Sequence, residues 1–334
     1  MTYDVHAHIV PGELMELLRA DGPSFGIEAF QNSKGEELLR LAGRVEIGPF
    51  PAELFDLEAR FAAMEAGGVT VQLVSHRTDF SAYALAAEGG TRYARAFNRI
   101  LADLVSSHPD RLLALGTVPL QAPAAAAAEL DHAVRELGMV GVEIATSVDG
   151  VSLDQAGLDP FWEVANELRC LILLHPYDVL RGIDLSRYFL ENIFGRPAES
   201  AMAIAHLLFS GVFERYPDLV LCMVHGGGYM PYQLGRWEKG YEVVPQITGR
   251  NLRQPPLEYV RRLYYDSLLH LPQAIGYLLD LVGPSQVVIG TDYPYPMAER
   301  QPVSFIDSIP GLRPEDREGI LTGNVERILK GIRR

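Results

Sequence analysis

Three histidines and one aspartate occupy positions in the sequence where strands of a buried sheet are expected to end. His6 and His8 lie in the segment YDVHAHI, while His175 closes CLILLH and Asp292 closes QVVIGTD. Side chains two residues apart on a strand point to the same face, so the first two imidazoles can act together. Any one of these histidines alone would more readily be a packed core residue. Three neutral imidazoles with one carboxylate suit zinc or a similar first-row ion, so together they predict a metal site with a position left for water.

A further histidine, His225, closes the apolar segment LVLCMVH and is followed by three glycines at 226–228. Glycine permits a sharp turn and a close approach of the backbone. A histidine beside a metal-activated water, but outside the ligand set, can transfer protons near neutral pH. We therefore predict that His225 is the catalytic acid/base, with a fifth ligand or a packing residue as the alternatives.

The elements that must position these residues are short β-rich segments, separated by stretches long enough for a helix. Most are continuous apolar runs, as expected of parallel strands buried on both faces. They cover residues 3–9, 69–75, 112–118, 140–146, 170–175, 219–225, 262–268 and 286–292. This alternation predicts the α/β class and a (β/α)₈ TIM barrel, with an open doubly wound sheet as the alternative. In a barrel, the carboxyl ends of the strands converge on one mouth, which brings distant residues together.

The segment between the first two strands, about residues 12–68, is longer than a simple helical return. Its sequence NSKGEELLRLAGRVEIGPFP predicts a small insertion with its own hairpin, which in a barrel is expected to cover the mouth. The composition does not change along the chain, and no linker or repeat separates two parts. We therefore expect a single domain over residues 1–334.

Lysine usage indicates the number of metal ions. Binuclear barrels of this kind bridge two ions with a carbamylated lysine at the end of the fourth strand, but the lysines here stand at positions 34, 239 and 330, outside every predicted strand. Glu143 is the ionisable residue of the fourth strand, VGVEIAT, and lies in its middle. A bridge through Glu143 is the less favoured alternative, and one ion per chain is predicted.

Composition narrows the possible partners. The 334 residues carry a formal charge of −14, which argues against binding to nucleic acids and to anionic membranes. The amino terminus, MTYDVHAH, has neither the basic start nor the apolar stretch of a signal peptide, and no window is apolar enough for a membrane span. Cys170 and Cys222 lie in apolar runs and are expected to be buried, reduced thiols. These features predict a cytoplasmic protein.

The segments YDVHAHIVP, LLHPYD, CMVHGGGYMPYQLGRW and IGTDYPYP together resemble the amidohydrolase superfamily, and within it the aminocarboxymuconate-semialdehyde decarboxylase branch. The resemblance covers nearly the whole chain. It implies the same four metal ligands, with His225 as the acid/base. It also implies that Arg236 contacts a substrate carboxylate in a neighbouring subunit's site, and therefore a homodimer or larger assembly. The aromatic residues around Arg236 are typical of interface anchors, although helix packing would use them equally.

The sequence departs from the branch pattern at two places. The decarboxylase that gives the branch its name has a second substrate-binding arginine in the region matching 44–50, where this chain reads RVEIGPF and Arg44 is the candidate, several positions early. A tryptophan of the loop after strand five is replaced by Asn192. Both departures argue against the namesake substrate and leave the metal chemistry unchanged.

Three more polar residues are candidates for the pocket. His76 ends the second predicted strand and His270 follows the seventh, so each is a candidate substrate contact, with a structural role as the alternative. Asp178 follows His175 closely and is expected to orient a ligand imidazole or a water, or else to cap a helix.

These observations predict a mononuclear, metal-dependent, non-oxidative decarboxylase of an unsaturated or aromatic carboxylic acid. Zinc is the preferred metal and manganese the alternative. Asp292 and His225 are the expected catalytic residues, and Arg236, His76, Asn192 and His270 the expected substrate contacts. A hydrolase or hydratase using the same metal site is the second hypothesis, and a barrel that binds metal and ligand without turnover is the third.

Overall fold

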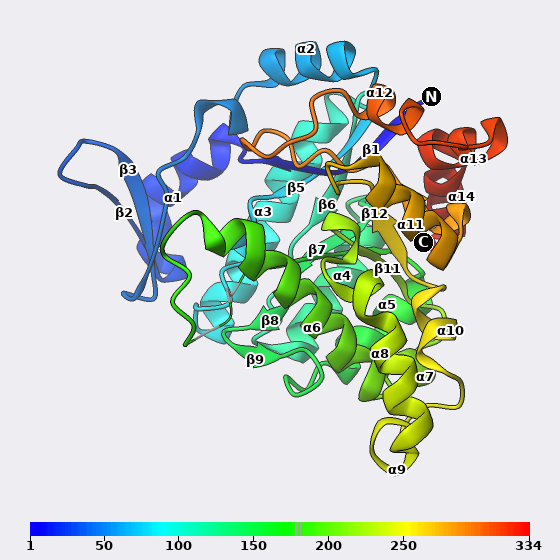
Figure 1. Cartoon of the computed structure of the whole chain (residues 1–334). Coiled ribbons are helices and arrows are strands. Elements are labelled where there is room, and N and C mark those ends of the chain that lie inside the picture. The colour runs from blue at the N-terminus through cyan, green and yellow to red at the C-terminus, as the bar shows by residue number, and fades with distance from the viewer. Residues whose placement is uncertain (178–179, 181) are drawn as a thin grey trace.

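A barrel of parallel strands forms the centre of the molecule, as Figure 1 shows. The computed structural model describes residues 1–334 except 178, 179 and 181. Among the described residues, the barrel has eight strands: β1 (Tyr3–Ile9), β5 (Val71–His76), β6 (Leu112–Gly116), β7 (Gly141–Ala145), β10 (Leu171–His175), β11 (Val220–Met223), β12 (Tyr264–Asp266) and β13 (Val287–Val288). Each predicted strand has its counterpart, so the predicted (β/α)₈ class is confirmed.

The first and last strands close the barrel. The amide of Val5 donates to the carbonyl of Ile289 over 2.9 Å, and the amide of His8 donates to the carbonyl of Tyr293 over 2.7 Å. Side chains reinforce this seam, because the hydroxyl of Thr291 donates to the buried carboxylate of Asp4 over 2.6 Å. The residues on either side of the metal-ligand positions are therefore fixed by closure of the sheet.

Helices surround the barrel. The longer ones are α1 (Gly12–Phe25), α2 (Leu57–Gly67), α3 (Ala87–Ser106), α4 (Pro123–Arg135), α5 (Asp159–Leu168), α6 (Arg196–Phe209), α8 (Met230–Val243), α11 (Pro272–Val282) and α14 (Asn324–Gly331). Shorter ones are α7 (Val212–Arg215), α9 (Pro245–Thr248), α10 (Pro256–Val260), α12 (Pro302–Asp307) and α13 (Pro314–Glu318), with single turns η1 (Ala52–Leu54), η2 (Thr78–Ser81), η3 (Glu191–Gly195), η4 (His225–Gly227), η5 (Pro284–Gln286) and η6 (Gly319–Gly323).

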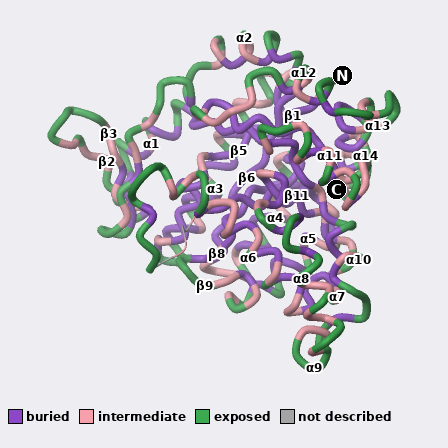
Figure 2. Tube along the Cα trace, in the orientation of Figure 1, coloured by how far each residue is buried: buried purple, intermediate pink, exposed green. Residues whose placement is uncertain are grey.

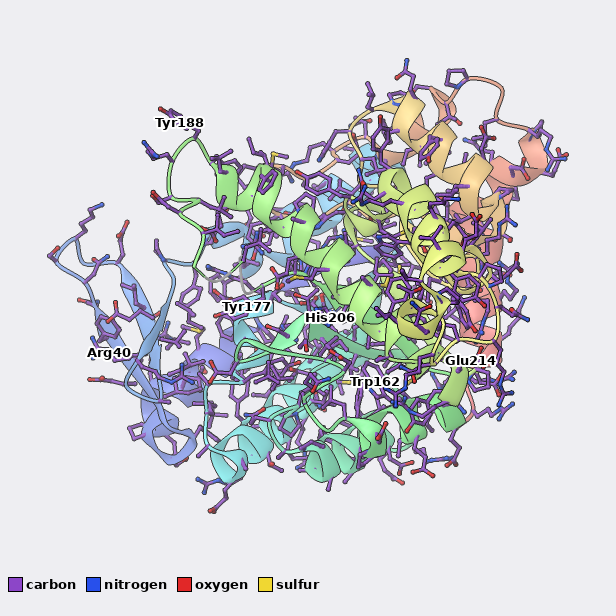
Figure 3. The ribbon with its side chains drawn as sticks, turned by 60° about the horizontal axis from the view of Figure 1, so that its bottom comes forward. Arg40, Trp162, Tyr177, Tyr188, His206 and Glu214 are labelled. Carbon is purple, nitrogen blue, oxygen red and sulfur yellow. The ribbon has the colours of Figure 1, made fainter. Side chains whose placement is uncertain are left out.

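Buried residues gather in the centre of the molecule (Figure 2), and the hydrophobic ones form clusters inside the barrel and between the strands and helices. The inner cluster takes residues from most strands, among them Val5, Leu73, Leu115, Leu173, Cys222 and Val288. In the outer layer, α3 buries apolar residues four positions apart, Tyr93, Phe97 and Leu101, as an amphipathic helix does. Trp162 on α5, labelled in Figure 3, is fully buried in the same layer.

The predicted insertion after the first strand is present and contains one more strand than the expected hairpin. Its antiparallel sheet consists of β2 (Ile27–Gln31), β3 (Glu37–Leu41) and β4 (Val45–Ile47), and it projects to one side of the barrel beside α1 (Figure 1). A second small hairpin, β8 (Ser147–Val148) and β9 (Val151–Ser152), follows β7. The insertion touches the mouth from the side, where the carbonyl of Pro49 accepts a hydrogen bond from Arg77.

Two further expectations can be compared with the structure. In the part of the chain that is described, no helix combines the length and the apolar character needed to cross a bilayer. Cys170 and Cys222 are free and fully buried, which confirms the expectation of unpaired thiols.

Candidate metal centre and active site

The four predicted ligands come together at the carboxyl ends of the strands. One ligand atom from each of His6, His8, His175 and Asp292 lies within 4.8 Å of the other three, and all four residues are buried. The Nε2 atoms of His6 and His8 are 3.2 Å apart, and Oδ1 of Asp292 lies 3.5 Å and 3.2 Å from them. The predicted barrel was expected to bring the carboxyl ends of its strands together at one mouth, and the structure confirms this.

A bulge in β1 contributes to this convergence. The pairing of β1 with β5 shifts by one residue between Asp4, which lies opposite Gln72, and Ala7, which lies opposite Val74. Such a bulge re-aims side chains and is common beside active sites. It turns the histidine end of β1 relative to its beginning, where Asp4 holds the barrel seam.

The remaining nitrogen of each histidine is held by a fixed partner. With Nε2 directed to the centre, Nδ1–H of His6 donates to Asp266 over 2.7 Å, and that of His8 donates to the carbonyl of His76 over 2.8 Å. Nδ1 of His175 lies 2.8 Å from both the carbonyl of Pro176 and the hydroxyl of Thr78. Such partners fix the tautomer that a metal ligand needs.

The donor set fits a divalent metal ion. Three imidazole nitrogens and one carboxylate oxygen converge from β1, β10 and the segment after β13, and this composition is typical of sites for zinc and similar ions. Oδ1 of Asp292 is buried and has no hydrogen-bond partner among the described residues. A buried carboxylate oxygen without a partner is costly, so the site is built for a cation.

The charges in the site are strongly coupled. Burial lowers the pKa of His6, but the hydrogen bond to Asp266 and the charge of Asp292 outweigh it and raise that pKa to about 9. Burial raises the pKa of Asp292, yet its interactions with the nearby imidazoles of His225 and His6 hold it well below its usual value. Asp292 is therefore a carboxylate, as a metal ligand has to be.

His225 lies beside the cluster and outside it. Its Nε2 is 3.9 Å from Oδ2 of Asp292, and its ring centroid is 5.3 Å from those of His6 and His175. Its backbone has φ +55°, in the left-handed region, as does that of Asp292 at φ +60°. Strained backbone at two such residues is a known mark of functional sites. The turn after it requires glycine, because a Cβ on Gly228 would lie 2.1 Å from the carbonyl oxygen of Pro197.

A cavity of about 560 Å³ opens above these residues. This volume is in the range of small-molecule sites. The polar side chains that line it are Arg77, Thr78, Asp79, His175, Tyr177, Asn192, Arg196, His225, Tyr229, His270, Asp292 and Tyr295. Metal-ligand residues, the candidate acid/base and a ligand-sized space thus share one place.

Comparisons with known proteins agree with this geometry. The profile of the family described as Amidohydrolase matches residues 3–331. This chain belongs to the amidohydrolase family. It is 29% identical over 326 residues to 2-amino-3-carboxymuconate-6-semialdehyde decarboxylase of Dictyostelium discoideum, covering 98% of this chain and 90% of that relative.

Solved structures of amidohydrolase-fold decarboxylases are also similar. The 5-carboxyvanillate decarboxylase of Sphingomonas paucimobilis superposes with a TM-score of 0.83 at 25% identity, covering 99% of each chain. A dihydroxybenzoic acid decarboxylase of Polaromonas sp. JS666, with bound manganese and the inhibitor 2-nitroresorcinol, has a TM-score of 0.78 at 21% identity, covering 98% of this chain and 96% of that one. The latter shares the fold.

Of the residues predicted to contact the substrate of this amidohydrolase, some line the cavity and others do not. Asn192, on η3, and His270, after β12, both line the cavity. His76 does not line the cavity: it is fully buried, its ring packs against Phe97 of α3, and its Nδ1 lies 3.7 Å from the carboxylate of Glu143. Asp178, the predicted orienting residue, lies outside the described residues.

The two arginines considered from the sequence both lie away from this amidohydrolase's cavity. Arg236 is exposed on α8, so any role in catalysis requires another subunit. Arg44 is exposed and forms an ion pair with Asp149, at 2.5 Å, so it is not the second substrate-binding arginine of this chain's pocket.

Glu143 lies behind the metal cluster. Its Oε2 is 3.6 Å from Nδ1 of His8, the nitrogen that faces away from the centre, and its Oε1 is 3.7 Å from Nδ1 of His76. It is not part of the converging ligand set among the described residues. The geometry therefore supports one metal ion in this amidohydrolase.

The sequence analysis did not identify every residue that orients a candidate ligand or lines the cavity. Asp266 holds both His6 and the turn after His225, whose Gly226 amide donates to it over 2.9 Å. A single aspartate at the carboxyl end of a predicted strand, in YYDSLLH, was the available signal. The arginines of the cavity, Arg77 and Arg196, lie in turns and at a helix start, where no strand-end rule marks them.

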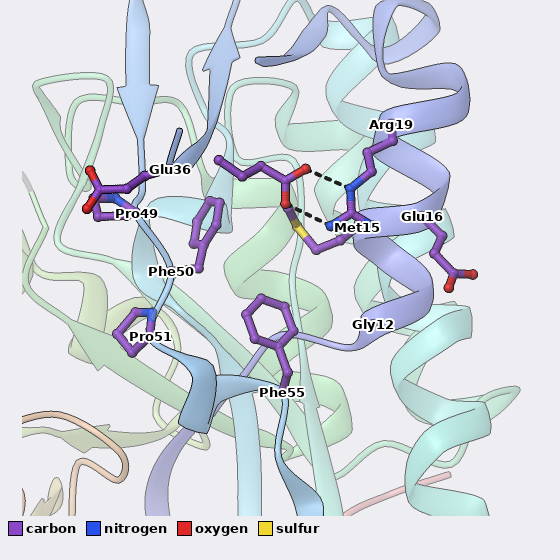
Figure 4. Close-up of a pocket in the computed structure, with 10 residues that line it drawn as sticks. Gly12, Met15, Glu16, Arg19, Glu36, Pro49, Phe50, Pro51 and Phe55 are labelled. Carbon is purple, nitrogen blue, oxygen red and sulfur yellow. Dashed lines mark hydrogen bonds and ion pairs between the residues drawn. The ribbon is translucent and has the colours of Figure 1, made fainter. Parts of the chain in front are cut away.

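A second cavity, of about 660 Å³, lies between α1 and the insertion and is drawn in Figure 4. Arg19 forms two hydrogen bonds with Glu37 at its edge, of 2.6 and 2.7 Å. Its aromatic residues are Phe50 and Phe55. It contains none of the metal-ligand residues, so the chemistry of this amidohydrolase is assigned to the first cavity.

Proposed function

We propose that this amidohydrolase is a mononuclear, metal-dependent, non-oxidative decarboxylase of an unsaturated or aromatic carboxylic acid. The observation that carries the proposal is the position of His225, which lies beside a complete ligand set and faces a cavity of substrate size. The similarity to decarboxylases at 29% and 25% identity supports the same reaction. We also propose that residues 1–334 form a single domain, since the family profile covers 3–331.

The metal would be held by Nε2 of His6 and His8, a ring nitrogen of His175 and a carboxylate oxygen of Asp292. When bound, such an ion supplies a Lewis acid that polarises and orients substrate oxygens. Asp266 and the carbonyl of His76 keep two of the ligand imidazoles in the required tautomer.

His225 delivers the proton that the reaction requires. The substrate carbon bearing the carboxylate takes this proton from the imidazole, which uses an electron pair of the conjugated system. The bond to the carboxylate then breaks, its electrons restore conjugation, and CO₂ leaves. Asp292, 3.9 Å from Nε2 of His225, stabilises the protonated imidazole before transfer.

Zinc is the metal we propose, because a site of three imidazoles and one carboxylate suits its ligand preferences. Manganese is the alternative, since it occupies the Polaromonas structure of the same fold. Removing metal with a chelator and restoring activity with Zn²⁺ or Mn²⁺, one at a time, distinguishes the two.

We further propose a homodimer or larger assembly in which Arg236 completes the neighbouring pocket. Exposed aromatic residues lie at the cavity and on α8: Phe189, which lines the cavity, is 57% exposed, and Tyr232, on the same helix as Arg236, is 82% exposed. The neighbouring Tyr188 extends from the molecule in Figure 3. Exposed aromatics with an arginine are typical of interface anchors.

The experiment is an assay of metal-loaded protein against a panel of carboxylated phenols and muconates, with direct detection of CO₂. The proposal expects stoichiometric CO₂ and product for at least one compound, and none with His225→Ala protein of equal metal content. Addition of water or hydrolysis without CO₂ would replace the proposal by the hydrolase or hydratase alternative.

A further inference from the structure

The turn that carries the candidate ligand Asp292 is built around a buried tyrosine that the proposed reaction does not use. Asp292 has φ +60°, in the left-handed region, and its amide donates to the carbonyl of His6 over 2.8 Å. Such a backbone at a residue other than glycine costs free energy, and it persists where the surrounding contacts determine it. The next residue in the chain, Tyr293, is 5% exposed. Contacts of Tyr293 can therefore fix the position of the ligand.

Two guanidinium groups lie over the ring of Tyr293. Cζ of Arg60 is 4.8 Å from the ring centroid, and Cζ of Arg300 is 5.2 Å from it. A guanidinium within about 6 Å of an aromatic centroid is attracted by the negative face of the ring, and the attraction is stronger where water is excluded. Arg60 is fully buried on α2, whereas Arg300 is exposed before α12. The ring thus joins two segments that lie outside the barrel sheet.

Arg60 also holds the end of β1. One terminal nitrogen of its guanidinium donates to the carbonyl of His8 over 2.5 Å, and the other donates to the side chain of Gln72 over 2.9 Å. Both acceptors are neutral, and the carboxylate of Asp4 is reached through Gln72, whose amide donates to it over 2.9 Å. Burial lowers the pKa of Arg60 to about 10, so the group is still charged at neutral pH. A buried cation with neutral hydrogen-bond partners depends on every further attractive contact, and the ring of Tyr293 provides one.

Arg300 holds the residues that follow the tyrosine. Its Nη2 donates to the carbonyl of Pro294 over 3.0 Å and to that of Tyr295 over 3.3 Å. These carbonyls and the ring of Tyr293 belong to one short turn, which begins directly after the ligand aspartate. The exposed Arg300 and the buried Arg60 therefore hold the same turn from two segments of the chain.

We propose that Tyr293 is a positioning residue for the metal site, and that Arg60 and Arg300 hold its ring in place. Through these contacts the ring keeps Asp292 in its left-handed conformation, beside the His8 end of β1. Residues that orient metal ligands act on metal affinity without binding the ion themselves. The inference rests on the proposed metal site, and it does not depend on which reaction follows.

The test measures the Zn²⁺ affinity of the full-length protein by competition with a chromophoric chelator. Tyr293→Leu removes the ring and keeps an apolar side chain, and it should weaken the affinity about tenfold, as loss of an orienting residue does. Tyr293→Phe keeps the ring and should stay within about threefold of the wild type. Arg300→Gln should weaken the affinity by a smaller factor than Tyr293→Leu. Arg300→Lys, which keeps a positive charge for the ring, should recover part of that loss.

The visible absorption of Co²⁺-substituted protein is the second readout, because the d–d bands of Co²⁺ depend on the geometry of its ligands. These bands should shift in Tyr293→Leu and stay unchanged in Tyr293→Phe. Phe30→Leu is the matched control: it removes a ring that lies 4.2 Å from Cζ of Arg40, in the insertion and outside the ligand set. A loss that is merely structural would lower thermal stability and leave both metal readouts unchanged, as expected for this control.

Thermal unfolding of each metal-free variant shows whether it folds. A folded Tyr293→Leu protein with wild-type Zn²⁺ affinity and Co²⁺ bands would overturn the inference, and so would a Tyr293→Phe protein that loses as much affinity. If Tyr293→Leu does not fold, Arg300→Gln decides, because Arg300 is exposed, and unchanged affinity and bands in that variant overturn the inference. A wild type that binds no divalent ion would overturn the proposed metal site together with this inference.

Discussion

Replacing Asp266 by asparagine should strip the site of metal without removing any ligand. Oδ2 of Asp266 accepts from Nδ1–H of His6, while Oδ1 accepts from the amides of Gly226 and Leu268 over 2.9 and 3.1 Å. Asparagine has one acceptor oxygen, which the two amides would retain. The amide nitrogen of the asparagine then faces His6. Nδ1 of His6 can accept a hydrogen bond from this NH₂ group only after it has lost its own proton. The remaining proton moves to Nε2, the atom that has to bind the metal.

The size of the effect follows from this tautomer conflict. Loss of an orienting partner typically weakens metal affinity by about 10- to 100-fold. Because the asparagine favours the wrong tautomer and also lacks the negative charge, we expect the upper end of this range. A 100-fold change corresponds to about 2.7 kcal/mol in the free energy of metal binding.

Metal affinity is measured by competition with a chromophoric chelator at a fixed pH, with circular dichroism to verify the fold. Asp280→Asn is the matched control, since Asp280 is exposed on α11, is not one of the converging ligand residues, and the same chemical change is made. A well-folded Asp266→Asn protein whose dissociation constant stays within about threefold of the wild type would refute the reasoning about His6.

Further predictions concern the number of ions, the roles of the histidines and the assembly. Metal analysis should give about one divalent ion per chain, and a requirement for two would contradict the mononuclear site. His175→Ala should lose metal, whereas His225→Ala should keep it and lose turnover by ~10² or more; metal-free His225→Ala protein would make His225 a ligand. Mixing Arg236→Ala with His175→Ala chains should restore activity once subunit exchange is demonstrated by tagged pull-down. Proven exchange without restored activity would exclude a role of Arg236 in a partner's site.

The convergence of the four candidate ligands could be predicted because it depends on where the barrel strands end. A buried parallel strand is recognisable from a few apolar residues, and the barrel then fixes which ends meet. His6, His8, His175 and Asp292 needed no information on register. The four residues could therefore be predicted to form one cluster although they lie far apart in the sequence.

His76 shows where this reasoning stops. It was correctly placed at the end of a strand, but successive side chains point to opposite faces. Ser75 is the residue that faces the metal side, with its hydroxyl 3.4 Å from Nδ1 of His8, whereas the ring of His76 packs against Phe97 of α3 and lies beside Glu143. The cavity is lined from this segment only by the residues that follow His76, Arg77 to Asp79.

The cavity arginines could not be predicted for a different reason. Arg77 reaches the cavity because its guanidinium is anchored by Pro49, which belongs to the insertion, and Arg196 because Pro176 anchors it at the start of α6. Both positions depend on contacts between segments distant in sequence. Local patterns do not encode such contacts, whereas the strand-end rule encodes the ligands.

The seam between β1 and β13 has a consequence for how the chain acquires its metal. Asp4 and Thr291 are 287 residues apart in sequence, yet they hold the barrel closed beside ligands from both ends of the chain. A growing polypeptide on the ribosome offers the imidazoles of His6 and His8 early and the carboxylate of Asp292 only near the end. An ion held by these residues would connect the two ends of the chain. Bringing residues so far apart in sequence together costs conformational entropy, which the contacts of the complete barrel offset. Metal loading is therefore coupled to completion of the whole fold.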